Sequence, residues 1–144
     1  MRALKRGVLA AALCLAAGAA QAQQMTLAAG GHQIKAEVVS TERARQFGLM
    51  YRSHLPPDQG MLFVYSSPIR LCMWMKNTLI PLSVAFLDED GRILNIEDMS
   101  PQSEESHCAA KAVRFALEMN RGWFVAHGIK PGDRIEGVKD LSAN

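Results

Sequence analysis

The chain has 144 residues, of which 49% are hydrophobic and 21% charged, and its formal net charge is +2. This length suits a single domain, and no internal repeat, low-complexity stretch or long linker divides the sequence. Without Arg2, Lys5 and Arg6 at the N-terminus, the charge balance is −1, which gives no general attraction to nucleic acid or anionic lipid.

The first 22 residues have the pattern of a secretory signal peptide. Arg2, Lys5 and Arg6 form a basic head, residues 7–20 are apolar and uncharged, and residues 20–22 fit a small-x-small cleavage site. An uncleaved membrane anchor or a lipoprotein is less consistent with this pattern, and no later segment is long and apolar enough to cross a membrane. Cleavage removes three basic residues and leaves 122 residues with 13 basic and 14 acidic side chains. We therefore expect one exported, monomeric domain over 23–144, located in the bacterial periplasm.

The start of this domain predicts a β-hairpin followed by a short helix. Residues 25–28 lead through a Gly-Gly turn into a strand at 32–39, where apolar and charged side chains alternate as in a half-buried strand. Ser40 or Thr41 can cap a helix over 41–50. The side chains expected to cover the core are Ala44, Phe47 and Leu49, and those expected to face solvent are Arg43 and Arg45.

The remaining segments read mainly as strands and turns. In chain order they are a turn at 54–60, strands at 60–65 and 72–75, a hairpin at 82–99 with its loop at 88–91, a polar loop at 101–111, a strand at 113–119, a short helix that Asn120 caps and Gly128 ends, and a turn with a last strand at 130–138. In the strand at 113–119, Glu118 falls on the polar side with Arg114. About seven strands and two short helices predict an α+β, mainly β fold, either a small antiparallel barrel or a strongly curled sheet.

Four stretches together carry a family resemblance. They are ERARQFGLMYR (42–52), GMLFVY (60–65), WMKNTLIPLSVAF (74–86) and ALEMNRGWFVAHGIKPGD (116–133). These blocks resemble domain-of-unknown-function family 192 over about residues 25–138. The resemblance implies a compact, β-rich, often exported single domain, and it implies no reaction. Many members carry an aspartate after the IPL tripeptide, whereas this chain has Ser83, so a role that needs a carboxylate there is in doubt.

The heptad CMWMKNT, residues 72–78, is the candidate binding site. On a strand, Trp74 and Lys76 share one face with Cys72, while Met73, Met75 and Asn77 share the other. One interpretation is structural, with the methionines filling core and Trp74 half-buried at its rim. The other is a pocket in which Trp74 is an apolar platform and Lys76, Asn77 and Thr78 are polar anchors.

Three further polar side chains of the family blocks are candidates for the same site: Arg43, Arg52 and Glu118. Their alternative role is an ordinary pairing of an arginine with a carboxylate between a helix and the sheet. The sequence favours a module that binds an unidentified small molecule or an envelope partner, without nucleic acid, membrane insertion or a cofactor.

Enzymatic and metal-binding functions have weaker support. No G-x-S-x-G, H-E-x-x-H or phosphate-binding loop occurs, and the four histidines are scattered. A hydrolase with unidentified catalytic residues remains an alternative. Cys72, Met73, Met75, His107 and Cys108 are soft ligands, so Cu(I) handling is another. Because these ligands do not form a Met-rich loop, we expect no resident metal.

The two cysteines of the mature domain, Cys72 and Cys108, predict a disulfide. They form an even pair in a compartment that oxidises thiols. The bond would tie the loop at 101–111 to the strand that begins at Cys72.

Overall fold

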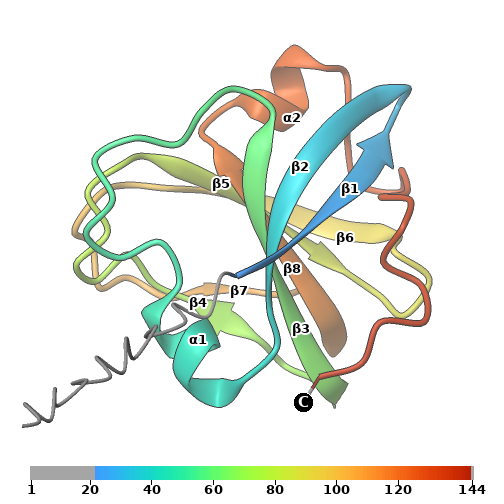
Figure 1. Ribbon diagram of the computed structural model, residues 1–144, viewed down its shortest axis with the longest axis horizontal. Coiled ribbons are helices and arrows are strands. Elements are labelled where there is room, and N and C mark those ends of the chain that lie inside the picture. Colours follow the sequence, from blue (N-terminus) through green and yellow to red (C-terminus); the bar gives the residue numbers. More distant parts are fainter. Residues whose placement is uncertain (1–21, 144) are drawn as a thin grey trace, which may run out of the picture.

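The computed structural model describes residues 22–143, in which a six-stranded sheet organises most of the chain (Figure 1). Its strands are β1 (Gln23–Ala29), β2 (His32–Val39), β3 (Gln59–Ile69), β5 (Leu82–Leu87), β6 (Ile93–Met99) and β8 (Val113–Asn120). A separate two-stranded sheet pairs β4 (Cys72–Met73) with β7 (His107–Cys108), and the helices are α1 (Glu42–Phe47) and α2 (Trp123–Ala126). The predicted signal peptide lies outside the described residues, apart from Ala22.

The sheet has the order β1-β2-β3-β8-β5-β6. Four of its five neighbouring pairs are antiparallel, and the pair β2–β3, which α1 connects, is parallel. The mainly β prediction is therefore confirmed. Of the two architectures predicted, the structure matches the strongly curled sheet, because the described residues form no pairing between the edge strands β1 and β6.

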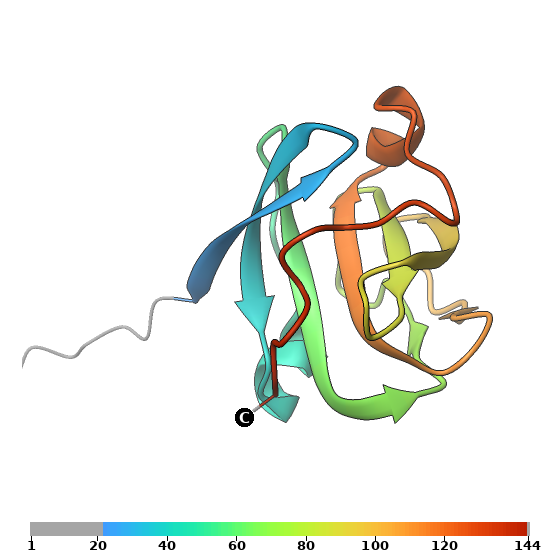
Figure 2. The ribbon, with the colours of Figure 1, turned by 90° about the vertical axis from the view of Figure 1, so that its right-hand side faces the viewer.

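The C-terminal segment runs across the open side of the curled sheet, as the red trace in Figure 2 shows. It makes isolated bridges from Glu136 to Ala28 and from Arg134 to Arg92, which directly precedes β6. The turn predicted at the start of 130–138 is present, but the last strand predicted after it is wrong, because pairing of these described residues is limited to the two bridges. Gly132 and Gly137 have φ values of +94° and +99°, so the extended backbone is interrupted on both sides of these bridges.

Local sequence explains most element boundaries. Gly30 and Gly31 have φ values of +53° and +79°, the left-handed backbone that a two-residue hairpin turn requires between β1 and β2. Thr41 caps α1, since its side chain accepts the backbone N–H of Ala44 at 3.2 Å. The predicted cap of α2 is wrong: Gly122 precedes that helix, whereas Asn120 ends β8 and donates to the Leu55 carbonyl oxygen at 2.8 Å.

The core consists of two hydrophobic clusters on opposite faces of the sheet. Strand β3 contributes Leu62 and Val64 to the first cluster, and Met61 and Phe63 to the second. The curl of the sheet, α2 and the C-terminal segment enclose the first cluster. Loop segments cover the second cluster, among them the one that contains the candidate heptad. Among the described residues, no helix is long and apolar enough to cross a membrane.

Candidate functional site

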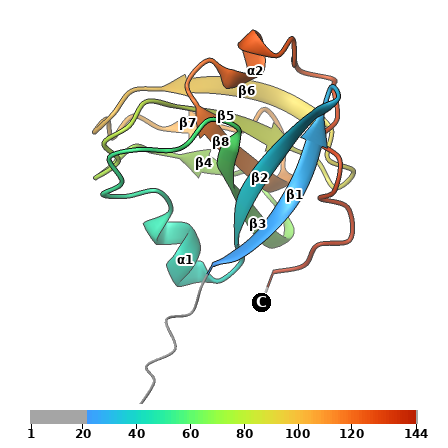
Figure 3. The same cartoon turned by 45° about the horizontal axis from the view of Figure 1, so that its top comes forward.

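A cleft of about 450 Å³ opens over the second cluster, between α1, the end of β3 and the segment that begins with β4. Figure 3 shows α1 and β4 on the same side of the molecule, as Figure 1 does. Most of the lining of this cleft is apolar or aromatic, and α1 contributes a few polar side chains. The lining residues are Glu42, Arg45, Gln46, Phe47, Gly48, Leu49, Met50, Phe63, Tyr65, Ile69, Cys72, Met73, Trp74 and Thr78.

Trp74 forms part of this cleft with its ring half in solvent. Its exposed fraction is 48%, and the Lys76 ammonium lies 5.2 Å from the ring centroid, within cation–π range. The prediction of a strand over 72–75 is wrong beyond Met73. The chain turns after that residue, and the Thr78 N–H donates to the Met75 carbonyl oxygen at 3.1 Å.

Asn77 and Thr78 have different roles in this turn. Asn77 has a φ of +54°, a left-handed conformation that asparagine adopts more readily than most residues, and its carbonyl oxygen accepts the Tyr51 N–H at 2.9 Å. Thr78 is buried, lines the cleft and donates its hydroxyl to the Lys76 carbonyl oxygen at 3.2 Å. Asn77 therefore links this turn to the segment after α1 through its backbone, whereas Thr78 is part of the surface of the cleft.

Both arginines predicted for the site lie outside the cleft. Arg52 forms a two-pronged salt bridge with Glu37 of β2, with N···O distances of 2.5 and 2.7 Å. The hydrogen bond to Glu37 raises the pKa of Arg52. The pair ties the segment between α1 and β3 to β2. Arg43 is exposed on α1, as predicted, and does not line the cleft.

Glu118 lies in the middle of the sheet, although its alternation with Arg114 predicted a solvent-facing side chain. Its neighbours are Met61 on β3 and Val84 on β5, and its exposed fraction is 4%. Burial raises the pKa of this carboxyl to about 8, which leaves it protonated at neutral pH. The sequence-based expectation failed because both faces of β8 are covered by a core cluster. Glu118 is not among the residues that line the cleft.

Sequence reasoning missed several side chains of the cleft. Phe47 was expected to cover the core and is 54% exposed, whereas Arg45 was expected in solvent and is partly buried against β3. Tyr65 and Met50 were not singled out. The available signal for Tyr65 was its spacing of two residues from Phe63 and four from Met61, which places all three on the same face of β3.

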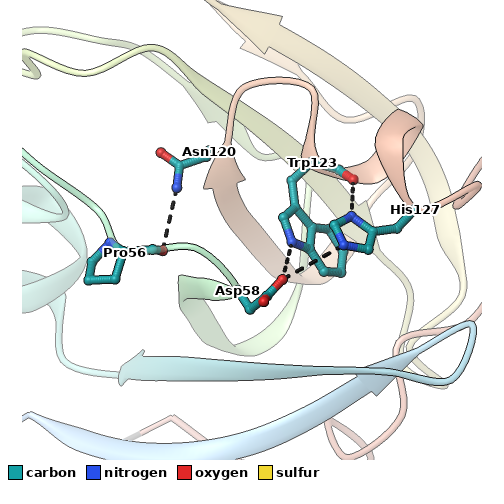
Figure 4. A network of polar contacts seen from close by, with 5 residues as sticks. All are labelled: Pro56, Asp58, Asn120, Trp123 and His127. Atoms are coloured by element: carbon teal, nitrogen blue, oxygen red, sulfur yellow. Dashed lines mark hydrogen bonds and ion pairs between the residues drawn. The ribbon is translucent and has the colours of Figure 1, made fainter.

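A cluster of polar contacts, separate from the cleft, lies at the end of the molecule where α2 is found (Figure 4). The indole N–H of Trp123 donates to Asp58 Oδ1 at 2.9 Å, and His127 Nε2 lies 3.7 Å from the same oxygen. His127 stacks on Trp123 with a centroid distance of 4.2 Å, and its Nδ1 is 2.7 Å from the Trp123 carbonyl oxygen. His32 packs edge-on against His127. No group of three or more His, Cys, Asp or Glu residues in 22–143 is arranged to hold a metal ion.

Cys72 and Cys108 form a disulfide between β4 and β7, with an S–S distance of 2.03 Å. They are direct partners in the two-stranded sheet, and their Cα atoms are 4.0 Å apart. The bond ties the loop at 101–111 to the segment that contains Trp74. It thereby fixes one wall of the cleft.

Comparison with known proteins assigns the chain to a family. The family model described as "Uncharacterized ACR", domain-of-unknown-function family 192, matches residues 25–137. The chain belongs to this family. No protein with a curated description matches it.

Two solved structures extend the family comparison. One, from Sinorhizobium meliloti 1021, is described as a "putative transcription regulator" and has a TM-score of 0.74 and 38% identity, over 78% of this chain and 90% of that one. The other, a protein of unknown function from Novosphingobium aromaticivorans DSM 12444, has a TM-score of 0.78 and 33% identity, over 83% of this chain and 89% of that one. Both support the fold and the family assignment.

Ser83 marks the departure of this chain from many members of family 192. Its hydroxyl is buried, donates to Asp98 Oδ1 at 2.6 Å and accepts the Gly122 N–H at 2.9 Å. The neighbouring strand β6 therefore supplies a carboxylate close to the position at which other members carry one. In this chain the group joins β5, β6 and the entry to α2, so a structural role accounts for it.

Proposed function

We propose that this protein is an exported binding module of the bacterial envelope, and that the cleft between α1, β3 and the β4 segment holds a small molecule with an apolar body. The distribution of exposed apolar side chains carries this proposal. The described residues expose six large hydrophobic side chains, of which Phe47, Ile69 and Trp74 line the cleft. Tyr51 packs against Phe47 with a ring-centroid distance of 6.0 Å and extends the same patch.

The size and lining of the cleft favour a small molecule over a large partner surface. Its volume of about 450 Å³ lies within the range of roughly 300–1,000 Å³ of ligand pockets. Such pockets combine apolar walls with a few polar groups that orient the ligand. Here Phe63, Met73 and Trp74 provide apolar wall, while Arg45, Tyr65 and Thr78 provide the polar groups.

Two features support export. The first strand begins at Gln23, directly after the predicted cleavage site. The disulfide suits an oxidising compartment. N-terminal sequencing of the protein from a periplasmic extract should give Gln23 as the first residue. Recovery of the full-length chain from the cytosol would refute the export proposal.

A role in transcription, suggested by the description of the S. meliloti structure, has less support. Residues 23–144 contain 13 basic and 14 acidic side chains, which gives no excess of positive charge to attract a phosphate backbone. Among residues 22–143, Arg45 is also the one arginine or lysine that lines the cleft, so these residues form no row of basic side chains along it.

The proposal can be tested with N-phenyl-1-naphthylamine, an uncharged apolar dye whose fluorescence rises on binding. We expect saturable binding to the wild type and about a tenfold weaker affinity for Trp74→Ala, because the indole provides a stacking surface. Val125→Ala is the matched control, since Val125 is 82% exposed on α2, away from the cleft. Absence of saturable binding, or equal loss in both variants, would refute the proposed site.

A further inference from the structure

Arg45 occupies the wall of the cleft with most of its hydrogen-bonding capacity unused. Its Nη1 donates to the carbonyl oxygens of Ser40 and Val64, the latter at 3.0 Å. Its guanidinium carbon lies 4.6 Å from the centroid of the Tyr65 ring. These contacts fix the plane of the guanidinium. Within residues 22–143, no hydrogen bond or ion pair involves its Nε or Nη2.

Two other partly buried arginines each use two guanidinium nitrogens. Arg52 forms two hydrogen bonds with the carboxylate of Glu37. Arg114 donates through Nε and Nη2 to the backbone carbonyl oxygens of Tyr65 and Leu141. Arg45 is also partly buried, but it is bonded through a single nitrogen. A fixed guanidinium with free donors matches the geometry of a carboxylate.

Tyr65 places a second donor in the same cleft. Its side chain lines the cleft beside Arg45, and its hydroxyl makes no hydrogen bond within the described part of the chain. Burial raises the pKa of the Tyr65 phenol, while the Arg45 guanidinium lowers it and the Glu118 carboxyl raises it. The net effect is a rise, so the phenol stays protonated at neutral pH and can donate to an acceptor.

We infer that the ligand of this cleft is an apolar molecule that carries one carboxylate, and that Arg45 and Tyr65 bind this carboxylate. The inference rests on the proposed function and specifies the class of molecule. The aromatic and methionine side chains contact the apolar body, whereas Arg45 and Tyr65 orient its charged end. Two sources share this chemistry: a free fatty or aromatic acid, and the C-terminal carboxylate of an apolar peptide.

The other charges near the cleft permit an anion there. Glu42 lines the cleft, but it is exposed and accepts a hydrogen bond from Gln46 at 3.2 Å, so solvent screens its charge. Glu118 lies beside Met61 and Val84 of the second cluster, and burial keeps its carboxyl uncharged at neutral pH. Lys76 lies over the Trp74 ring, and its Nζ is 3.9 Å from Glu104 Oε1 in an exposed ion pair. The two opposite charges offset each other.

Three eight-carbon molecules of matched shape test the inference on the wild-type protein: octanoate, octanamide and octylamine. Titration calorimetry at neutral pH and low salt should give an affinity for octanoate about tenfold higher than for octanamide, with octylamine the weakest. An apolar tripeptide with a free or an amidated C-terminus identifies the source. A preference for the free-acid peptide over octanoate assigns the cleft to peptide C-termini, and the reverse assigns it to small acids.

Two variants of the same helix separate local binding from the general field of the protein. Arg45→Gln and Arg43→Gln remove the same charge from α1, but only Arg45 lines the cleft. We expect Arg45→Gln to bind octanoate and octanamide equally and Arg43→Gln to keep the preference. Because Arg45 also ties α1 to β3, retained octanamide binding verifies that the variant is folded. Should it unfold, Tyr65→Phe provides the test, with an expected several-fold loss for octanoate alone.

Specific outcomes overturn the inference. They are equal affinities of the wild type for octanoate and octanamide, tighter binding of octylamine, or the same loss in both arginine variants. Saturable dye binding combined with any of these leaves the proposed function intact and removes only the carboxylate assignment. Failure of the dye itself to bind removes both.

Discussion

Trp74 lines the cleft and Trp123 belongs to the first core cluster, and their surroundings differ in kind. Trp123 is 6% exposed, donates its N–H to Asp58 and stacks on His127 (Figure 4). Trp74 is 48% exposed, and within the described residues its N–H makes no hydrogen bond. A side chain whose packing and polar atoms are both satisfied stabilises the fold. A large aromatic ring held at the edge of a cleft is available to a ligand.

The two tryptophans should therefore differ most in their effect on stability. Trp123→Ala removes a buried side chain of the first core cluster and should lower the free energy of unfolding by about 3–5 kcal/mol. Trp74→Ala should leave it within about 0.5 kcal/mol of the wild type. Urea denaturation measures both. A loss of several kcal/mol in Trp74→Ala would show that Trp74 is a structural residue and would remove the basis for the cleft.

The region around Trp74 depends instead on the disulfide. The closed loop between Cys72 and Cys108 has a sequence separation of 36 residues, for which chain entropy gives a stabilisation of roughly 4 kcal/mol. The double variant Cys72→Ser/Cys108→Ser should lose up to this amount. Fluorescence in a Trp74→Phe background should show that the Trp123 environment persists, because the first cluster includes no residue of β4 or β7. Free thiols in the oxidised, denatured wild type would exclude the bond.

The sequence predicted those elements that local patterns determine. Both long hairpins and α1 follow from alternation, turn residues and a threonine cap, all of which lie within a few residues of each other. The cleft could be predicted only in part, because it forms where α1 packs beside the end of β3 and the β4 segment. Trp74 and Thr78 were found, whereas Arg45 and Tyr65 were missed, since their contact joins α1 to β3. Arg43 and Arg52, which the sequence made candidates for the same site, do not line the cleft.

Glu118 shows a different limit of sequence reasoning. Alternation of polar and apolar residues in β8 normally indicates one solvent-facing side, but core clusters cover both faces of this strand. Only the packing of the loops over the second cluster reveals that the carboxyl is buried. Burial of this carboxyl in turn makes the free energy of unfolding depend on pH.

Glu118→Gln should remove this contribution to the pH dependence of the free energy of unfolding. The carboxyl has a pKa of about 8 in the folded protein and an ordinary value of 4.5, so folding takes up a proton between these pH values. Its contribution to stability is complete below pH 4.5 and is lost as the pH rises to 8, at about 1.4 kcal/mol per unit. Glutamine does not titrate, so the variant should gain at least about 2 kcal/mol on the wild type between pH 5 and 8.

Glu89→Gln is the control for this measurement, because Glu89 is exposed in the loop between β5 and β6. Denaturation of both variants at several pH values isolates the buried group, since all other titrations cancel against the wild type. Parallel stability curves for Glu118→Gln and the wild type would show that the carboxyl is ionised at neutral pH.

Modest effects on stability are expected at Asp58, whose carboxylate joins the polar groups around Trp123. Asp58→Asn keeps an oxygen that can accept the indole N–H and removes the charge near His127. The Asp58 side chain is 58% exposed, and such exposed pairs contribute less than about 1 kcal/mol, so this substitution should cost no more than that. Asp58→Ala also removes the acceptor of a buried N–H and should cost about 1–3 kcal/mol.

Asp58→Gly separates the hydrogen bond from the backbone, because Asp58 has a φ of +59°, which glycine and asparagine tolerate better than alanine. If the indole bond dominates, glycine and alanine should destabilise the protein to a similar extent, and both more than asparagine. If backbone strain dominates, alanine alone should be costly and glycine should resemble asparagine. The second pattern would mean that Trp123 is held by packing rather than by its polar partner, and the contrast with Trp74 would then rest on burial alone.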